Sequence, residues 1–377
     1  MTLGLEPTAQ LALDTVMHRP TRGIPCKGLN VMEHRWLERL AGAEPGAYRK
    51  RPEQVYLACQ RAIGVCAIDQ WIPTNPLTMG SSGYEGAEQT ATTGLKQIVR
   101  DGMVIDSAEA VVRHLEEKVC PDLTARVARF DHAAHVKAVV DGERAIQATL
   151  GPSILKTGYG FASFPHLRYV EYGYENYFMA YLAYPEVMGK VFAREADLCL
   201  LENQAAVEAF RTGALPPYFR LDHDMADSNG TLVDIASLDK LWFPHFTRCI
   251  QPLARAGIRL LWHCDGNLMK MVPRLIEAGV NGFQGFQYED GMDYEAICGM
   301  RSRDGETLSI IAGVSVTTTL PLGKPEDVKD QLAFLVKHGP PVGLFLGASS
   351  SIAPGVPWDN LKTLVDGLAH YREHGRG

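Results

Sequence analysis

Short apolar runs alternate with longer amphipathic segments in the C-terminal part of the chain, and this alternation constrains the fold most. Apolar runs begin near residues 217, 258, 280, 307 and 342. Strands that are apolar along their whole length are typical of parallel sheets covered by helices on both faces. The pattern therefore predicts consecutive βα units, with helices over residues 237–256, 268–278, 294–300, 325–338 and 358–371.

Chain length decides between the two common parallel α/β architectures. A (β/α)8 barrel needs about 250 residues, and the chain has 377. No G-x-G-x-x-G motif follows an apolar run, so the alternative of a doubly wound dinucleotide-binding sheet loses its main support. We predict an α/β fold in which residues 51–377 form a (β/α)8 TIM barrel and residues 1–50 form a helical N-terminal extension packed on it.

Composition excludes several classes of protein. The formal net charge is −7 and the chain has no block of Lys or Arg, which disfavours binding to nucleic acid or to an anionic membrane surface. No apolar stretch is long enough for a membrane span, and the first residues do not resemble a signal peptide. The eight cysteines include no C-x-x-C pair. We expect a cytoplasmic enzyme without disulfides, with a homodimer as one possible assembly.

Polar residues follow several of the apolar runs, where a barrel carries its active site. After the run at 258 comes H-C-D-G, in which His263 and Asp265 are two residues apart and point to the same side of an extended chain. An imidazole and a carboxylate placed in this way can bind a divalent metal or act as an acid–base pair. Alternatively, His263 is structural and Asp265 caps the next helix. We expect Cys264 to be packed in the core.

Carboxylates follow two other runs. Asp222 and Asp224 repeat the two-residue spacing and could serve general acid–base catalysis, or they could anchor the turn at 228–230. Glu289 follows the run at 280 and could complete a metal site, or it could be an ordinary residue of a first helical turn. We also expect substrate contacts from four further side chains: Gln287, Tyr288, Ser350 and Tyr159. The aromatic members of this set would suit an aromatic substrate, although they could equally belong to the core.

Two stretches carry a family resemblance. Residues 258–282 read IRLLWHCDGNLMKMVPRLIEAGVNG, and residues 343–361 read GLFLGASSSIAPGVPWDNL. Together with looser similarity at 172–184 and 224–230, they resemble the uroporphyrinogen decarboxylase superfamily over roughly residues 50–372. The resemblance implies a (β/α)8 barrel with its cleft at the carboxyl ends of the strands.

One branch of this superfamily decarboxylates porphyrinogens without a cofactor. The resemblance places Asp69, in the sequence AIDQW, at the position of that branch's substrate-binding aspartate. The arginine-rich segment that holds the substrate carboxylates in that branch has no counterpart in residues 25–39. Because such a substrate needs cationic partners, this departure disfavours the decarboxylase.

The other branch consists of corrinoid-linked methyltransferases. Their zinc ligands are a His, a Cys two residues later and a Cys in the closing segment; here His263 matches, Asp265 replaces the first Cys and Ser350 lies near the second. A His and carboxylate set is harder than a thiolate set and suits an oxygen substrate. The resemblance thus implies a metal, most simply zinc, held by His263 and Asp265 with Glu289 as a third ligand.

The leading hypothesis is a metal-assisted methyltransferase that moves a methyl group from a methoxylated compound, aromatic ones included, to a separate corrinoid protein. Cobalamin would be carried by that partner, because the chain has no D-x-H-x-x-G motif. Asp222 or Asp224 would orient the substrate or move a proton. The alternatives are a decarboxylase in which Asp69 is central and a non-catalytic binding protein of the same fold.

Overall fold

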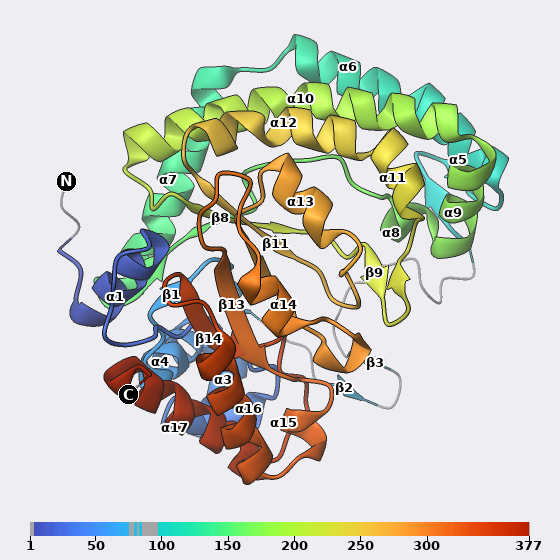
Figure 1. Ribbon diagram of the computed structural model, residues 1–377. Helices are drawn as coiled ribbons and strands as arrows, with labels where there is room; N and C mark the ends of the chain where they lie inside the picture. Colours follow the sequence, from blue (N-terminus) through green and yellow to red (C-terminus); the bar gives the residue numbers. More distant parts are fainter. Residues whose placement is uncertain (1–3, 75–78, 81–82, 85–96, 377) are drawn as a thin grey trace.

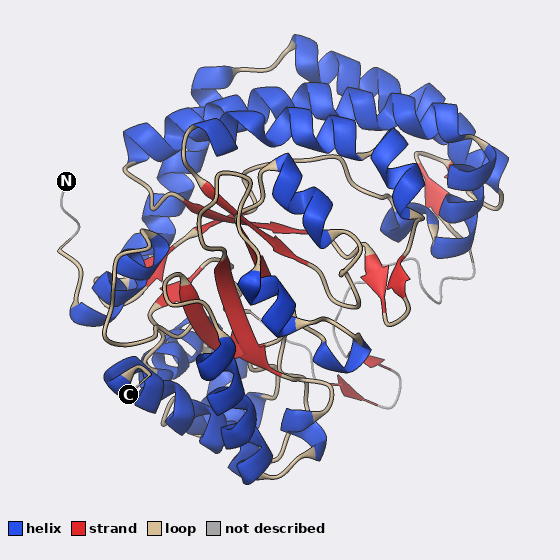
Figure 2. Cartoon of the chain, in the orientation of Figure 1, coloured by secondary structure: helices blue, strands red, loops and turns tan. Residues whose placement is uncertain are grey.

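A parallel sheet of six strands lies at the centre of the computed structural model, which describes residues 4–74, 79–80, 83–84 and 97–376 (Figures 1 and 2). From one edge the strands are β7, β8, β11, β12, β13 and β14, so neighbours in the sheet follow one another along the chain. Their bounds are Gly158–Tyr159, Tyr218–Asp222, Arg259–His263, Gly282–Gln284, Ser309–Val314 and Leu344–Ala348. The five strands predicted from the apolar runs are confirmed.

A second parallel pair, β1 (Ala67–Ile68) and β6 (Leu155–Lys156), lies beside this sheet. The backbone of residues 26–27 links the two, because Cys26 forms a bridge to Leu346 of β14 and Lys27 forms one to Ala67 of β1. The described residues thus show a curled parallel α/β sheet plus a separate pair. The prediction of a parallel α/β fold is confirmed, whereas the continuous eight-stranded sheet of a regular closed barrel is not shown.

Helices cover the outside of the sheet (Figure 1). Long α10 runs beside α12 on one side of the molecule, and α16 packs against α17 on another. Within the described residues, no helix is long and apolar enough to cross a membrane. The helices span Pro7–Val16 (α1), His34–Leu40 (α2), Ala47–Lys50 (α3), Pro52–Ile63 (α4), Ala108–His114 (α5), Cys120–Ala128 (α6), His132–Leu150 (α7), Tyr169–Tyr172 (α8), Tyr174–Ala183 (α9), Pro185–Gly213 (α10), Ile235–Leu241 (α11), Phe243–Arg255 (α12), Val272–Ala278 (α13), Tyr294–Gly299 (α14), Thr319–Leu322 (α15), Pro325–His338 (α16) and Trp358–His374 (α17).

Two predicted helices differ from the structure. The helix expected over 237–256 is split at Trp242 into α11 and α12, because Pro244 lacks an N–H and favours the first turn of a new helix. The helix expected from 268 begins only at Val272, since the residues before it form turns and bends. Among the described residues, two-residue strands form three antiparallel pairs: Met79–Gly80 with Gly83–Tyr84 (β2, β3), Val99–Arg100 with Met103–Val104 (β4, β5) and Ala226–Asp227 with Gly230–Thr231 (β9, β10).

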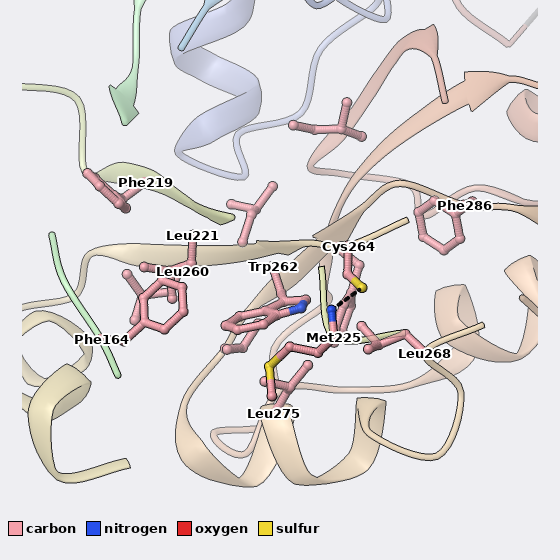
Figure 3. Close-up of a cluster of buried hydrophobic side chains, with 14 of the residues drawn as sticks. Phe164, Phe219, Leu221, Met225, Leu260, Trp262, Cys264, Leu268, Leu275 and Phe286 are labelled. Carbon is pink, nitrogen blue, oxygen red and sulfur yellow. Dashed lines mark hydrogen bonds between the residues drawn. The ribbon is translucent and has the colours of Figure 1, made fainter. Parts of the chain in front are cut away.

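The side chains of β8 and β11 alternate between an apolar and a polar face. Phe219, Leu221, Leu260 and Trp262 are buried in an apolar cluster together with Leu275 of α13 (Figure 3). The alternate residues of both strands therefore point to the opposite face of the sheet. Those residues are polar or charged at the carboxyl ends of the strands, and they form the candidate site.

Close backbone packing between β13 and β14 leads to a stability prediction. A Cβ atom on Gly313 would lie only 2.0 Å from the carbonyl carbon of Ala348, which is main chain and has little freedom to move. We expect Gly313→Ala to destabilise the protein by about 1–3 kcal/mol, as overpacking does. Gly142→Ala, in α7 with open space around its Cβ position, should be neutral or stabilising by up to about 1 kcal/mol. Midpoints of thermal unfolding test both, and equal midpoints for the two variants would contradict the prediction.

Candidate active site

Three side chains at the carboxyl edge of the sheet form a candidate metal site. Asp224, His263 and Asp265 each offer one ligand atom, and these atoms lie within 4.8 Å of one another. His263 Nε2 is 4.0 Å from Asp265 Oδ1. Ser350 donates a hydrogen bond of 3.3 Å to Asp265 Oδ2, and the Asp265 backbone N–H donates one of 2.9 Å to Asp224 Oδ1. Segments from three strand ends therefore meet at this cluster.

The cluster has unused capacity to bind a cation. Asp265 Oδ1, which faces His263 Nε2, is buried and has no hydrogen-bond partner among the described residues. The other nitrogen of His263, Nδ1, also lacks a partner there but lies beside Gly285. Burial raises the pKa of Asp265, the His263 side chain opposes this, and the nearby Asp224 carboxylate adds to it. A divalent cation would favour the ionised carboxylates, and this nitrogen and oxygen donor set suits zinc and harder ions. Ligand atoms of a tetrahedral ion bound at about 2.0–2.2 Å lie roughly 3.3–3.6 Å from one another, so the cluster would have to contract by about 1 Å to bind one.

The H-C-D-G segment owes its shape to a close backbone contact. Gly266 has a φ of +86°, and a Cβ atom there would lie 2.6 Å from the carbonyl oxygen of Asp227. Cys264 is buried as predicted, and its Sγ accepts a hydrogen bond of 3.2 Å from the Met225 N–H (Figure 3). Asp265 caps no helix, and the turn at 228–230 is held by Asp227, whose Oδ1 accepts from the N–H groups of residues 229 and 230. Asp265 is thus not a helix cap, and the 228–230 turn is held by Asp227, although Asp224 does anchor a neighbouring loop through the Asp265 N–H.

Asp69 lies deeper, at the centre of a buried ion-pair network. Its Oδ2 atom is 2.6 Å from Lys27 Nζ and 2.6 Å from Arg220 Nε, and the side chains of all three residues are at most 9% exposed. Burial alone would raise the pKa of Asp69, but the charges of Arg220 and Lys27 outweigh burial and hold this pKa well below its ordinary range. Burial lowers the pKa of Lys27 to about 8, against the opposing effect of Asp69.

The network extends from Arg220 to the surface of the site. Arg220 donates to Asp222 Oδ2 at 2.8 Å and to Gln70 Oε1 at 3.2 Å. Tyr159 donates to the same Asp222 oxygen at 3.1 Å, and its ring lies 4.6 Å from the Arg220 guanidinium carbon. Burial, followed by the Asp222 charge, raises the pKa of Tyr159 to about 12, so its hydroxyl stays protonated and remains a donor. Asp222 is therefore held as an oriented carboxylate.

A polar cavity of about 190 Å³ is lined by residues of both the ion-pair network around Asp69 and the candidate metal site. Its lining includes Lys27, Asp69, Arg220 and Asp222 from the ion-pair network, and His263 and Ser350 from the candidate metal site. Gln284, the last residue of β12, completes this wall and pairs in register with His263. The cavity thus lies at the carboxyl ends of the strands, where an active site was predicted.

Three predicted site residues lie outside this arrangement. Gln287 Oε1 accepts a hydrogen bond from the Gly266 N–H, so Gln287 supports the H-C-D-G segment. Tyr288 donates to the Gly313 carbonyl at 3.0 Å, and Glu289 accepts from the Ser315 hydroxyl at 3.1 Å. Glu289 is not part of the three-residue metal cluster, because Tyr288–Asp290 form a 3-10 turn (η2) and the Glu289 side chain bonds to Ser315, which follows β13.

Several residues of the cavity were not predicted from the sequence, among them Lys27, Arg220 and Gln284. Lys27 belongs to the predicted N-terminal extension, and Arg220 and Gln284 lie inside apolar runs. The one available signal was the presence of a charged residue in the otherwise apolar run PYFRL. An arginine inside a buried strand requires an acidic partner, which the structure identifies as Asp69.

Comparison with known proteins supports the fold. No family model matches the chain, and no curated protein sequence is significantly similar to it. Its structure is similar to that of a methyltransferase from Methanosarcina mazei, with a TM-score of 0.57, 16% sequence identity and coverage of 97% of this chain and 98% of that one. A Listeria monocytogenes structure provisionally assigned as a vitamin-B12 independent methionine synthase aligns with a TM-score of 0.43 at 13% identity, over 93% and 97% of the two chains. At such identities, the first similarity shows a shared fold over nearly the whole chain.

The buried network generates a prediction about stability and pH. Asp69→Asn leaves Lys27 and Arg220 buried with one counter-charge fewer, which should cost about 3–5 kcal/mol at pH 7. Because the pKa of Asp69 is lower in the folded than in the unfolded protein, the unfolded state binds more protons in acid. The stabilisation by Asp69 is then lost below about pH 4, by about 1.4 kcal/mol per pH unit.

Urea unfolding at several pH values measures this effect. The difference between wild type and Asp69→Asn should be constant from pH 7 to 5 and should shrink below about pH 4. Asp141→Asn, which removes an exposed partner of Lys137, is the matched control and should change stability by no more than about 0.5 kcal/mol. A difference that stays the same down to pH 3 would contradict the assignment of the charges.

Proposed function

We propose that this protein is a methyltransferase that takes a methyl group from a methoxylated compound with the help of a divalent metal, most simply zinc, and passes it to a corrinoid protein. The observation that carries the proposal is the cluster of Asp224, His263 and Asp265, in which the buried Asp265 Oδ1 has no hydrogen-bond partner among the described residues, beside a polar cavity. The fold shared with a methyltransferase supports the same reaction class.

Asp224, His263 and Asp265 would hold the metal, and Ser350 would orient Asp265 through its hydrogen bond. A bound divalent ion supplies Lewis-acid polarisation of the donor oxygen. The methyl group leaves that oxygen, which must then take up one proton. Asp222 is suited to relay this proton, because Arg220 and Tyr159 bind one of its oxygens and the residue lines the cavity.

The methyl acceptor in this proposal is the cobalt of a corrinoid carried by another protein. Its support is the sequence resemblance of residues 258–282 and 343–361 to the uroporphyrinogen decarboxylase superfamily, one branch of which consists of corrinoid-linked methyltransferases. The absence of thiolates supports an oxygen-bound methyl group as the donor, because the candidate metal site contains only imidazole and carboxylate ligands.

The decarboxylase alternative has less support from the site. Both oxygens of Asp69 are engaged, Oδ2 with Lys27 and Arg220 and Oδ1 with the Gln70 N–H at 2.6 Å. An aspartate so fully bound has little capacity left for a substrate. A non-catalytic role offers no reason for the buried Asp265 Oδ1 atom to be left without a partner among the described residues.

Metal analysis is the first test. We expect wild-type protein purified without chelator, supplied with zinc and freed of excess by gel filtration, to retain about one ion per chain, measured by elemental analysis. His263→Ala and Asp265→Asn should lose most of the bound zinc, because each removes one of three ligands. His132→Ala, which removes an exposed histidine of α7 that pairs with Glu208, should retain it. Circular dichroism of each variant establishes that it is folded.

Methyl transfer is then followed by the absorbance of methylcobalamin formed from reduced cobalamin and a methoxylated donor. Activity should require the zinc-loaded protein and disappear with a chelator. A folded wild type that binds no divalent metal, or a His263→Ala variant that binds as much as wild type, would overturn the proposed mechanism.

A further inference from the structure

A second pocket, of about 570 Å³, lies apart from the cavity of the candidate site and shares no lining residue with it. Its walls come from the last turns of α7 and α10, which pack side by side (Figure 1), from the segments that lead into β6 and β8, and from residues 4–5. The pocket therefore lies at the amino ends of β6 and β8, whereas the candidate site lies at the carboxyl ends of the strands. The proposed mechanism gives this pocket no role.

The walls of the pocket are mainly apolar and can be reached from solvent. The apolar side chains that line it are all at least partly exposed, and they are Leu5, Ala148, Pro152, Ala214, Leu215 and Pro216. Its volume is within the roughly 300–1,000 Å³ of typical small-molecule sites. A ligand with an apolar body would gain affinity by removing this surface from water.

The buried ion pair in the wall of the pocket is already satisfied. Lys156 Nζ donates to both carboxylate oxygens of Glu143, at 2.9 and 2.8 Å, and to the Thr157 carbonyl oxygen at 2.7 Å. All three N–H groups of the ammonium are therefore used, and the pair has no net charge. The charge that a ligand meets in this pocket must come from other residues.

Two exposed arginines beside the pocket lack a counter-charge. Arg144 lines the pocket and donates to two main-chain carbonyl oxygens at the end of α10, at 3.3 and 3.4 Å. Arg61 donates to the Leu150 carbonyl oxygen at 3.2 Å, and its Nη2 lies 3.4 Å from where a Cβ atom on the lining residue Gly151 would be. Within the described residues, neither guanidinium pairs with a carboxylate. A carboxylate would bind such groups through charge-assisted hydrogen bonds.

We propose that this pocket binds an amphipathic carboxylate, whose apolar body lies against the apolar walls and whose carboxylate is bound by Arg144, with Arg61 beside it. The apolar walls select the body of the ligand, and the two guanidinium groups select its negative charge. This inference does not depend on the proposed methyl transfer, because none of its residues belongs to the candidate metal site or to the polar cavity.

Ligand-observed NMR titrations of the full-length protein with four probes test the proposal. Octanoate has both features, octanol has no charge, octylammonium has the opposite charge, and butanoate has a shorter chain. We expect octanoate to bind about 3–10-fold more tightly than octanol, the effect of a charge-assisted hydrogen bond at an exposed group, and more tightly still than octylammonium. Butanoate should bind at least about 10-fold more weakly than octanoate, because each buried methylene group contributes about fourfold.

Variants assign the binding to this pocket. Ala148→Trp places a large side chain on the wall and should weaken octanoate binding at least about 10-fold. Ala145→Trp, at an exposed position of α7 outside the pocket, is the matched control and should bind octanoate as wild type does. Arg144→Gln should remove the preference for octanoate over octanol and leave octanol binding unchanged. Because Arg144 is exposed, this variant keeps the test valid if the Trp variant does not fold, which circular dichroism establishes.

The variant His263→Ala distinguishes this pocket from the candidate metal site, and it should bind octanoate as wild type does. Three outcomes would overturn the inference. They are octanoate binding no tighter than octanol, a folded Ala148→Trp or Arg144→Gln protein that binds octanoate as wild type does, and a folded His263→Ala protein that no longer binds octanoate. The last outcome would place the carboxylate in the candidate site.

Discussion

The arrangement of the site depends on the buried contact of Asp69 with Lys27 and Arg220. These residues come from three separate parts of the chain: the segment between α1 and α2, the end of β1 and the middle of β8. Two cations inside a sheet are tolerated only with a compensating anion. Both cations bind the same oxygen of Asp69. The contact therefore also fixes the position of Lys27, which lies where the backbone of residues 26–27 links β14 to β1.

The same contact organises the cavity. With its Nε atom bound to Asp69, the Arg220 guanidinium presents its remaining groups to Asp222 and Gln70, and Asp222 in turn accepts from Tyr159. The opposite faces of β8 and β11 are apolar and packed under helices. Each strand therefore contributes stability through one face and binding groups through the other, as its two-residue period allows.

The strands and the strand-end residues could be predicted from the sequence, because short stretches of neighbouring residues determine them. The apolar runs predicted the strands, and the two-residue spacing of His263 and Asp265 predicted that both would lie at one strand end. Asp224 joins them because β8 and β11 are neighbours in the sheet, which the order of the βα units implies. The placement of Glu289 was not predictable, because the 3-10 turn at Tyr288–Asp290 decides where its side chain lies.

The ion-pair network could not be predicted from short stretches of the sequence, for a different reason. Asp69 and Arg220 are 151 residues apart, and Lys27 lies in a segment whose path along the sheet depends on two isolated bridges. Such contacts are decided by how the sheet curls. Gln284 was not predicted as a site residue, because the sequence of a short buried strand does not show which groups a polar residue within it contacts.

The hydrogen bonds around the candidate metal ligands have a consequence for coordination. The Asp265 N–H engages one oxygen of Asp224, and Ser350 engages one oxygen of Asp265, so each carboxylate is left with a single free oxygen. With one nitrogen from His263, the protein offers three donor atoms in total. A tetrahedral ion held by three donors retains a fourth position, the feature that separates catalytic from structural zinc sites. If these residues hold a zinc ion as proposed, the hydrogen bonds from Ser350 and the Asp265 N–H would favour monodentate binding by each carboxylate and would leave that position to an exchangeable ligand.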